Sequence, residues 1–237
     1  MMKNKIQILS TGPVTEELIK EAAENDIIID EISFITTEDI DDIAIEKKIR
    51  ELSNQKITVV FTSTNAVNAV ARFISKQPGW KIFCIGSTTK TLVKKFFGEG
   101  AVAEFAENAE SLSKLILQNS SIQNIAFFCG DKRRDELPGN LNKGGIVVDE
   151  IVVYKTIETP TVLTKQYDGI LFFSPSAVQS FFSKNSINKN AKIFVIGSTT
   201  ANAVKLFSQQ PVIIAETPGK KNLVNLAINH FSKSNII

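Results

Sequence analysis

The feature that most constrains the fold of this chain is a segment that occurs twice. The first copy, KIFCIGSTTKTLVKKF, begins at Lys81, and the second, KIFVIGSTTANAVKLF, begins 111 residues later at Lys192. The same spacing relates FTSTNAV at 61–67 to FFSPSAV at 172–178. Because a strand, a turn and a helix recur together in register, the repeat predicts two copies of one α/β unit.

Short apolar runs alternate with segments of helical period along the whole chain. The runs lack polar alternation, which is typical of strands buried on both faces of a parallel sheet. We expect strands at Ile6–Leu9, Ile57–Phe61, Ile82–Ile85, Ile125–Phe128, Ile170–Phe173 and Ile193–Ile196, and helices at Val14–Ala23, Ala66–Ile74, Thr88–Phe97, Arg133–Leu141, Ala177–Phe182 and Thr199–Phe207. The fold class predicted is α/β, with two similar doubly wound parallel-sheet domains.

A second pair of similar segments, at a different spacing, indicates where the chain passes from one domain to the other. The segment DEISFITTE begins at Asp30 and resembles DEIVVYKTIE, which begins at Asp149. We expect a discontinuous first domain over 1–34 and 159–237, and an inserted second domain over 38–150. Residues 31–37 and 151–158 would be linker strands paired in antiparallel fashion. A tandem arrangement of the domains is the alternative.

Composition argues against several functional classes. The 237 residues carry 27 Lys and Arg against 25 Asp and Glu, and this balance does not favour nucleic-acid binding. A single histidine, His230, argues against a Ser-His-Asp triad or a histidine zinc site, so we expect no metal. Cys84 and Cys129 end apolar runs and are expected to be buried free thiols. No signal segment and no apolar run of about 18 residues occurs, which predicts a soluble, cytoplasmic protein with no membrane contact.

Hydroxyl and amide side chains follow the predicted strands, at the edge where ligands bind in open α/β sheets. These turns read FTSTN from Phe61, IGSTT from Ile85, CGDKR from Cys129, FSPS from Phe173 and IGSTT from Ile196. Ordinary N-capping explains any one of them. Several helix N-termini aimed at one place would instead bind a polyanion, since each carries roughly half a positive charge. The turns contain no phosphate-binding signature, so a nucleotide cofactor is not expected.

Two further features are candidates for chemistry. Tyr154 lies in the second linker segment, where it is either a packing aromatic or a proton donor. Lys132, Arg133 and Arg134 are predicted in the first turn of a helix, where basic residues oppose the helix dipole. This placement favours a nearby anion, with a solvated charge run as the alternative.

The ordered set of these motifs resembles the uroporphyrinogen-III synthase family over nearly the whole chain. The segments that carry the resemblance are FTSTNAV (61–67), CIGSTTKTLV (84–93), ENAESLS (107–113), CGDKRRDELPGNL (129–141), VVYKTIE (152–158), LFFSPSAV (171–178), VIGSTTANAV (195–204) and AETP (215–218). The resemblance implies two α/β domains joined by a two-stranded ladder. It also implies a cyclising hydro-lyase that acts on the linear tetrapyrrole hydroxymethylbilane in porphyrin and haem biosynthesis, without a metal or organic cofactor.

The resemblance further implies roles for particular residues. Tyr154 would assist departure of the substrate hydroxyl. The substrate-binding residues would be Ser63, Thr64, Asn65, Ser87, Thr88, Thr89, Gly130, Arg134, Ser174, Pro175, Ser176, Ser198, Thr199 and Thr200.

Two other functions are compatible with the sequence. One is a non-catalytic two-domain protein that closes on a small polyanion. The other is a nucleotide-using transferase, which the missing phosphate loops disfavour. The oligomeric state expected is a monomer.

Overall fold

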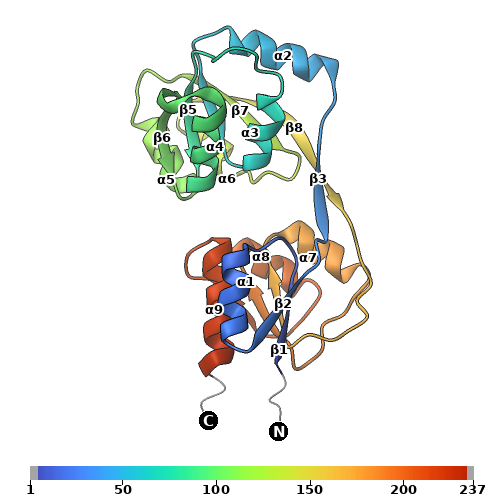
Figure 1. Ribbon diagram of the computed structural model, residues 1–237. Coiled ribbons are helices and arrows are strands. Elements are labelled where there is room, and N and C mark those ends of the chain that lie inside the picture. The colour runs from blue at the N-terminus through green and yellow to red at the C-terminus, as the bar shows by residue number, and fades with distance from the viewer. Residues whose placement is uncertain (1–4, 234–237) are drawn as a thin grey trace. The chain divides into compact units, whose positions relative to one another are not determined.

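The computed structural model describes residues 5–233, and the chain divides into two compact α/β units (Figure 1). Unit 1 combines residues up to Thr36 with residues from Ile157 onward, and unit 2 is the continuous segment Thr37–Thr156. Among the helices described, none combines the length and the apolar character that a bilayer crossing requires.

The sheet of unit 1 has five strands in the order β11-β10-β9-β1-β2, and all neighbouring pairs are parallel. In its centre, Ile8 pairs with Ile29 on one side and with Gly169 on the other. The strands are β1 (Ile6–Ser10), β2 (Ile27–Glu31), β9 (Gly169–Phe172), β10 (Lys192–Val195) and β11 (Val212–Ile214).

Helices cover both faces of this sheet. On one face α1 (Glu16–Glu24) lies beside α9 (Lys220–Lys233), and on the other α7 (Pro175–Phe182) packs with α8 (Ser198–Lys205) (Figure 1). Each face has its own apolar core. Burial of the helical stripes against the sheet is the main stabilising contribution, because it removes apolar surface from water.

The sheet of unit 2 has the order β3-β8-β7-β4-β5-β6. From β8 to β6 the neighbouring strands are parallel. The strands are β3 (Ile35–Asp39), β4 (Thr58–Phe61), β5 (Lys81–Ile85), β6 (Val102–Ala106), β7 (Asn124–Gly130) and β8 (Val147–Glu158).

Two layers of helices again enclose the sheet. One core packs against α2 (Ile43–Ser53), α3 (Thr64–Ala71) and α4 (Ser87–Phe97), and the other against α5 (Ala109–Leu117) and α6 (Glu136–Lys143). A short 3₁₀ turn (Glu99–Ala101) joins α4 to β6.

The strands β3 and β8 contain the two places where the chain passes between the units. They are neighbours in the larger sheet. The N–H of Ile40 donates to the carbonyl of Val153 at 3.0 Å, and that of Thr159 donates to the carbonyl of Phe34 at 2.9 Å. Because the partner number falls as the residue number rises, the pairing is antiparallel.

The two sheets have the same strand order once β3 is set aside. Unit 1 reads β2-β1-β9-β10-β11, and unit 2 reads β8-β7-β4-β5-β6. In each, the chain order reverses once, between β1 and β9 in unit 1 and between β7 and β4 in unit 2. Such a reversal is the topological switch point at which open α/β sheets bind ligands.

All six predicted strands are confirmed, as is the α/β class with parallel sheets. The prediction that the basic run 132–134 lies in the first turn of a helix is wrong, because α6 begins at Glu136. Arg133 lies in the loop before the helix, where its guanidinium pairs with Asp135 and with Glu150 of β8. An acidic residue occupies the first turn, as the helix dipole favours.

Candidate functional site

The hydroxyl of Ser63 lies at the switch point of unit 2, directly after β4. It caps α3, and its oxygen accepts a hydrogen bond from the N–H of Ala66 at 3.2 Å. The same hydroxyl donates to the phenolic oxygen of Tyr154 at 3.1 Å. An N-capping serine therefore also holds the one tyrosine of unit 2.

Tyr154 reaches this position because β8 slips by one residue against β7. Cys129 pairs with Val152, but Gly130 pairs with Tyr154, so Val153 is extra on β8. The aromatic ring lies directly over Gly130, since a Cβ at that position would be 2.4 Å from Cζ of Tyr154. Gly130 is therefore required by close approach of the ring.

The main chain that follows the side chain of Tyr154 is fixed by Asp131. Its N–H donates to the carbonyl of Tyr154 at 3.1 Å, and its carboxylate accepts from the N–H of Thr156 at 2.8 Å. The bulge and these two bonds set the position of the tyrosine through the backbone.

Burial raises the pKa of Tyr154 above its usual value of 10, and the hydrogen bond from Ser63 offsets part of that shift. The phenol is therefore protonated at neutral pH. Because Ser63 donates to the phenolic oxygen, the proton of Tyr154 is free to be donated elsewhere.

The switch point of unit 1 repeats the cap but not the tyrosine. Ser174 caps α7, and its oxygen accepts from the N–H of Ala177 at 3.1 Å, 111 residues after the matching bond in unit 2. Across the switch point, the buried Thr11 donates its hydroxyl to the carbonyl of Leu171 at 2.8 Å. The turn after β1 is thereby tied to β9.

The two GSTT turns begin α4 and α8 with glycine as the N-cap. Gly86 has φ of +83°, a conformation that favours glycine. The first two side chains of each helix are exposed and the third is buried, as helical periodicity requires. The exposed ones are Ser87, Thr88, Ser198 and Thr199, and the buried ones are Thr89 and Thr200. A ligand would meet the buried pair through their main-chain N–H groups.

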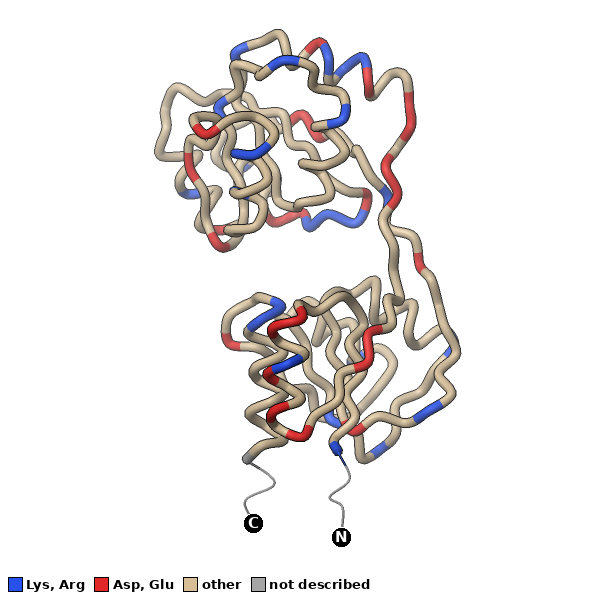
Figure 2. Tube along the Cα trace, viewed as in Figure 1, with Lys and Arg blue, Asp and Glu red and all other residues tan. Residues whose placement is uncertain are grey.

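The remaining predicted residues lie at the same two edges. Four are half-buried in the first turns of α3 and α7, namely Thr64, Asn65, Pro175 and Ser176. Arg134 is exposed in the loop before α6, and no ion pair joins it to another residue of the described chain. Charges of both signs are distributed along each unit (Figure 2).

Direct contacts bring together Ser63, Gly130 and Tyr154 in unit 2. In unit 1, Ser174 and Thr11 flank the equivalent point. Sequence reasoning missed Thr11 and also missed Lys220, the first residue of α9, whose ammonium donates to the carbonyl of Pro13 at 3.2 Å. Thr11 could have been predicted from the sequence, because it lies just after the first predicted strand.

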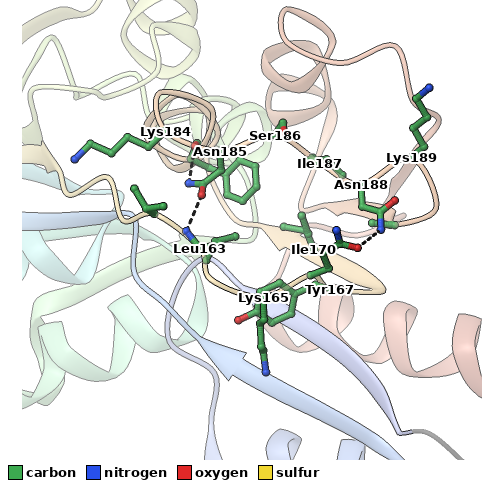
Figure 3. Close-up of a pocket in the computed structure, with 14 residues that line it drawn as sticks. Leu163, Lys165, Tyr167, Ile170, Lys184, Asn185, Ser186, Ile187, Asn188 and Lys189 are labelled. Carbon is green, nitrogen blue, oxygen red and sulfur yellow. Dashed lines mark hydrogen bonds between the residues drawn. The ribbon is translucent and has the colours of Figure 1, made fainter.

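A cavity of unit 1 lies at the opposite edge of the sheet. It measures about 510 Å³ and is lined by residues near the amino ends of β9 and β10, including Ile170 and Ala191. Its lysines, Lys165, Lys184 and Lys189, point away from one another (Figure 3). Lys165 is also paired with Asp30, so the cavity does not form a convergent anion site.

Within residues 5–233, no group of three His, Cys, Asp or Glu side chains could hold a metal ion. The available chemistry consists of hydroxyls, free helix N–H groups and a few cations. This set can bind an anion and donate a proton.

Comparison with known proteins identifies the family. Residues 16–225 match the family described as uroporphyrinogen-III synthase HemD. A curated relative from Schizosaccharomyces pombe, named uroporphyrinogen-III synthase, is 25% identical over 157 residues, which is 61% of this chain and 60% of that protein.

Solved structures of similar fold carry the same name. A mutant uroporphyrinogen III synthase from Thermus thermophilus superposes with a TM-score of 0.64 at 15% identity, covering 97% of this chain and 99% of that one. The uroporphyrinogen-III synthetase of Helicobacter pylori gives a TM-score of 0.65 at 15% identity, covering 95% and 99%. At these identities the likeness concerns the fold, and it agrees with the family match, from which we conclude that this chain belongs to the uroporphyrinogen-III synthase family.

Proposed function

We propose that this protein is a cyclising hydro-lyase that converts hydroxymethylbilane into uroporphyrinogen III in tetrapyrrole biosynthesis. The proposal joins the family match to one observation at the site. This observation is the phenol of Tyr154, which is held by Ser63 and Gly130 at the switch point of unit 2.

The reaction requires the protein to donate one proton and to hold the substrate in a fixed geometry. The C–O bond of the terminal hydroxymethyl group breaks, and the hydroxyl leaves as water after it takes a proton, for which Tyr154 is the proposed donor. The resulting cation is attacked by the substituted carbon of the last ring, which gives a spiro intermediate. The bond between that carbon and the methylene bridge to the third ring then breaks, and the methylene of the new cation bonds to the unsubstituted carbon of the same ring. A proton is released when that ring regains its aromaticity, so the overall change is loss of one water.

Selectivity in this scheme comes from position. An unassisted cation closes on the unsubstituted carbon and gives the type I isomer. Holding the chain so that the substituted carbon is nearer favours the type III isomer, because proximity and orientation change the relative barriers.

The substrate carries an acetate and a propionate on every pyrrole ring, and the two sheet edges suit such a polyanion. We propose that the helix N-termini bind these carboxylates through main-chain N–H groups and hydroxyls. The residues proposed for this role are Ser63, Thr64, Asn65, Ser87, Thr88, Thr89, Gly130, Arg134, Ser174, Pro175, Ser176, Ser198, Thr199 and Thr200.

The organisation of the working protein is proposed in the same way. Residues 1–34 with 159–237 and residues 38–150 would be the two functional domains, with 31–37 and 151–158 as connecting strands. The two compact units support this division. We also propose a cytoplasmic monomer that requires no nucleic-acid partner.

Analysis of the product isomer tests the function. Purified protein is supplied with hydroxymethylbilane, the product is oxidised to the porphyrin, and the isomers are separated by chromatography. The expected product is mainly the type III isomer. A type I product alone, as in the enzyme-free control, would show that the protein is not this synthase.

A further inference from the structure

Lys220 lies over the switch point of unit 1. It is the first residue of α9, which follows the edge strand β11, yet its ammonium reaches back to the two central turns. One contact is with the turn after β1, where the carbonyl of Pro13 accepts a hydrogen bond at 3.2 Å. The other is with the turn after β9, where the ring of Phe173 has its centroid 5.7 Å from Nζ.

These two turns also contact each other. A Cβ at Gly12 would lie 3.4 Å from the ring of Phe173, so the aromatic side chain covers the glycine. The main chain of Val14 is held by the carboxylate of Glu31, at the end of β2. The ammonium of Lys220 therefore lies over the turns after β1 and β9, which contact each other, and the turn after β1 is also held by the end of β2.

The local charge of Lys220 is unfavourable without a ligand. A cation at the first position of a helix opposes the dipole, and α9 has no acidic residue in its first turn. No ion pair joins Lys220 to a carboxylate among the described residues. Desolvation lowers the pKa of its ammonium, and the charge of Glu31 acts in the opposite direction.

The ammonium has three hydrogens, and the Pro13 carbonyl accepts one of them. The other two are available to an anion approaching the sheet edge. We infer that Lys220 binds a carboxylate of the tetrapyrrole substrate at the switch point of unit 1, an inference that rests on the proposed function.

The two units would then contribute different chemistry at equivalent places. In unit 2 the phenol of Tyr154 reaches across Gly130 to Ser63, and in unit 1 the ammonium of Lys220 reaches across Phe173 to Pro13. The internal repeat does not encode this difference, since neither side chain has a counterpart in the other copy. Lys220 is proposed as a binding residue and has no part in the proton donation by Tyr154.

Two neighbouring lysines allow a matched experiment. Lys220→Gln and Lys221→Gln remove the same charge from the same helix turn, and both residues are exposed. Of the two, among the contacts of the described residues, only Lys220 has a hydrogen bond and a ring contact with the turns of the switch point. Steady-state rates with hydroxymethylbilane are measured for the wild type and both variants, after subtraction of the non-enzymatic reaction. The melting temperatures of both variants are also measured. Equal values would show that loss of a charge at the helix N-terminus affects the stability of the two variants alike.

Lys220→Gln should raise KM by about tenfold with little change in kcat, because a charge-assisted hydrogen bond to the substrate is lost from ground state and transition state alike. Lys221→Gln should keep KM close to that of the wild type. Lys220→Arg, which keeps the charge, should recover most of the loss.

Equal KM values for the two glutamine variants, with a wild type that makes the type III isomer, would overturn the role of Lys220 and leave the proposed function intact. A wild type that makes only the type I isomer would overturn both.

A chemical readout complements the kinetics. With its lowered pKa, Lys220 should be acetylated by acetic anhydride faster than Lys221 at mildly alkaline pH, as mass spectrometry of peptides would show. Product tetrapyrrole at saturating concentration should protect Lys220 and leave Lys221 reactive. Unchanged acetylation of Lys220 under these conditions would contradict the inference.

Discussion

The hydroxyl oxygens of Ser63 and Tyr154 lie 3.1 Å apart, although 91 residues separate them in the chain. The serine oxygen accepts the N-capping hydrogen bond of α3, and the serine hydroxyl donates its proton to the phenol. The helix cap and the contact with Tyr154 therefore both depend on the position of this one side chain. The end of β4 and the bulge of β8 are thereby joined at the proposed centre of proton donation.

Replacement of Tyr154 by phenylalanine should lower turnover by about 100-fold or more, because general acid assistance is lost while the ring remains over Gly130. The measurement is the initial rate of type III isomer formation. Tyr167→Phe is the matched control, since it removes the only other phenol of the chain, at the opposite edge of unit 1. Wild-type turnover in Tyr154→Phe would remove this phenol from the mechanism.

Gly130→Ala should displace the aromatic ring and cost about 1–3 kcal/mol of stability, as overpacking does. The new Cβ would be 2.4 Å from the ring of Tyr154, and the ring has no flexible end with which to yield. Turnover and the denaturant midpoint should both fall. Gly139→Ala is the control: it lies in α6 with open space around it, so its stability should be equal to or above that of the wild type.

Ser63→Ala and Ser174→Ala should each lose about 1 kcal/mol of stability, since both remove an N-cap. They should differ in the titration of Tyr154. The bond from Ser63 lowers the pKa of this phenol, so its loss should move the pKa further upward. Near-ultraviolet absorbance in a Tyr167→Phe background measures the shift, and Ser63→Thr should restore the original value.

The sign of that effect also predicts the pH dependence of activity. A raised pKa keeps the phenol protonated through neutral pH, so donation fails only when the pH rises through the folded value, above 10. The alkaline limb of the rate profile should therefore lie at higher pH in Ser63→Ala than in the wild type. A shift in the opposite direction would show that Tyr154 donates to Ser63.

The two cysteines should report on unfolding. Cys84 and Cys129 are free and buried, and burial raises the pKa of each thiol to about 11. Neither should react with a disulfide reagent at pH 8 in the native state, because the thiolate is the reactive species. Both should react after addition of denaturant, and rapid modification of native protein would contradict their placement in β5 and β7.

The sequence predicted the repeated elements well, because the turn residues of each copy specify the same local structure. The caps of α3 and α7 are the clearest case, with Ser63 and Ser174 making equivalent bonds. The edge strands β6 and β11 are partly exposed and lack the long apolar run of the central strands, so the sequence did not predict them, and α9 was not predicted either. The two free thiols were predicted correctly from the apolar runs that contain them.

The site was harder to predict, because its geometry depends on contacts between distant segments. Tyr154 was a candidate from its position, but the one-residue slip that puts it over Gly130 is not visible in the sequence. Lys220 gave no signal, since only the packing of α9 brings its ammonium to Pro13. The basic run at 132–134 was predicted inside α6, but it lies before the N-cap residue Asp135 and the helix begins at Glu136.

The discontinuity of unit 1 has a consequence for synthesis of the protein. The ribosome releases β1 and β2 first, but their neighbour β9 emerges only after the whole of unit 2 has been made. Unit 2 can therefore complete its folding while β1 still lacks its neighbour β9. The edge of β1 that will pair with β9 stays exposed during this time. Nascent chains that stall before residue 169 would consist of a folded unit 2 attached to an aggregation-prone segment that contains β1 and β2. Such species are the kind that chaperones bind.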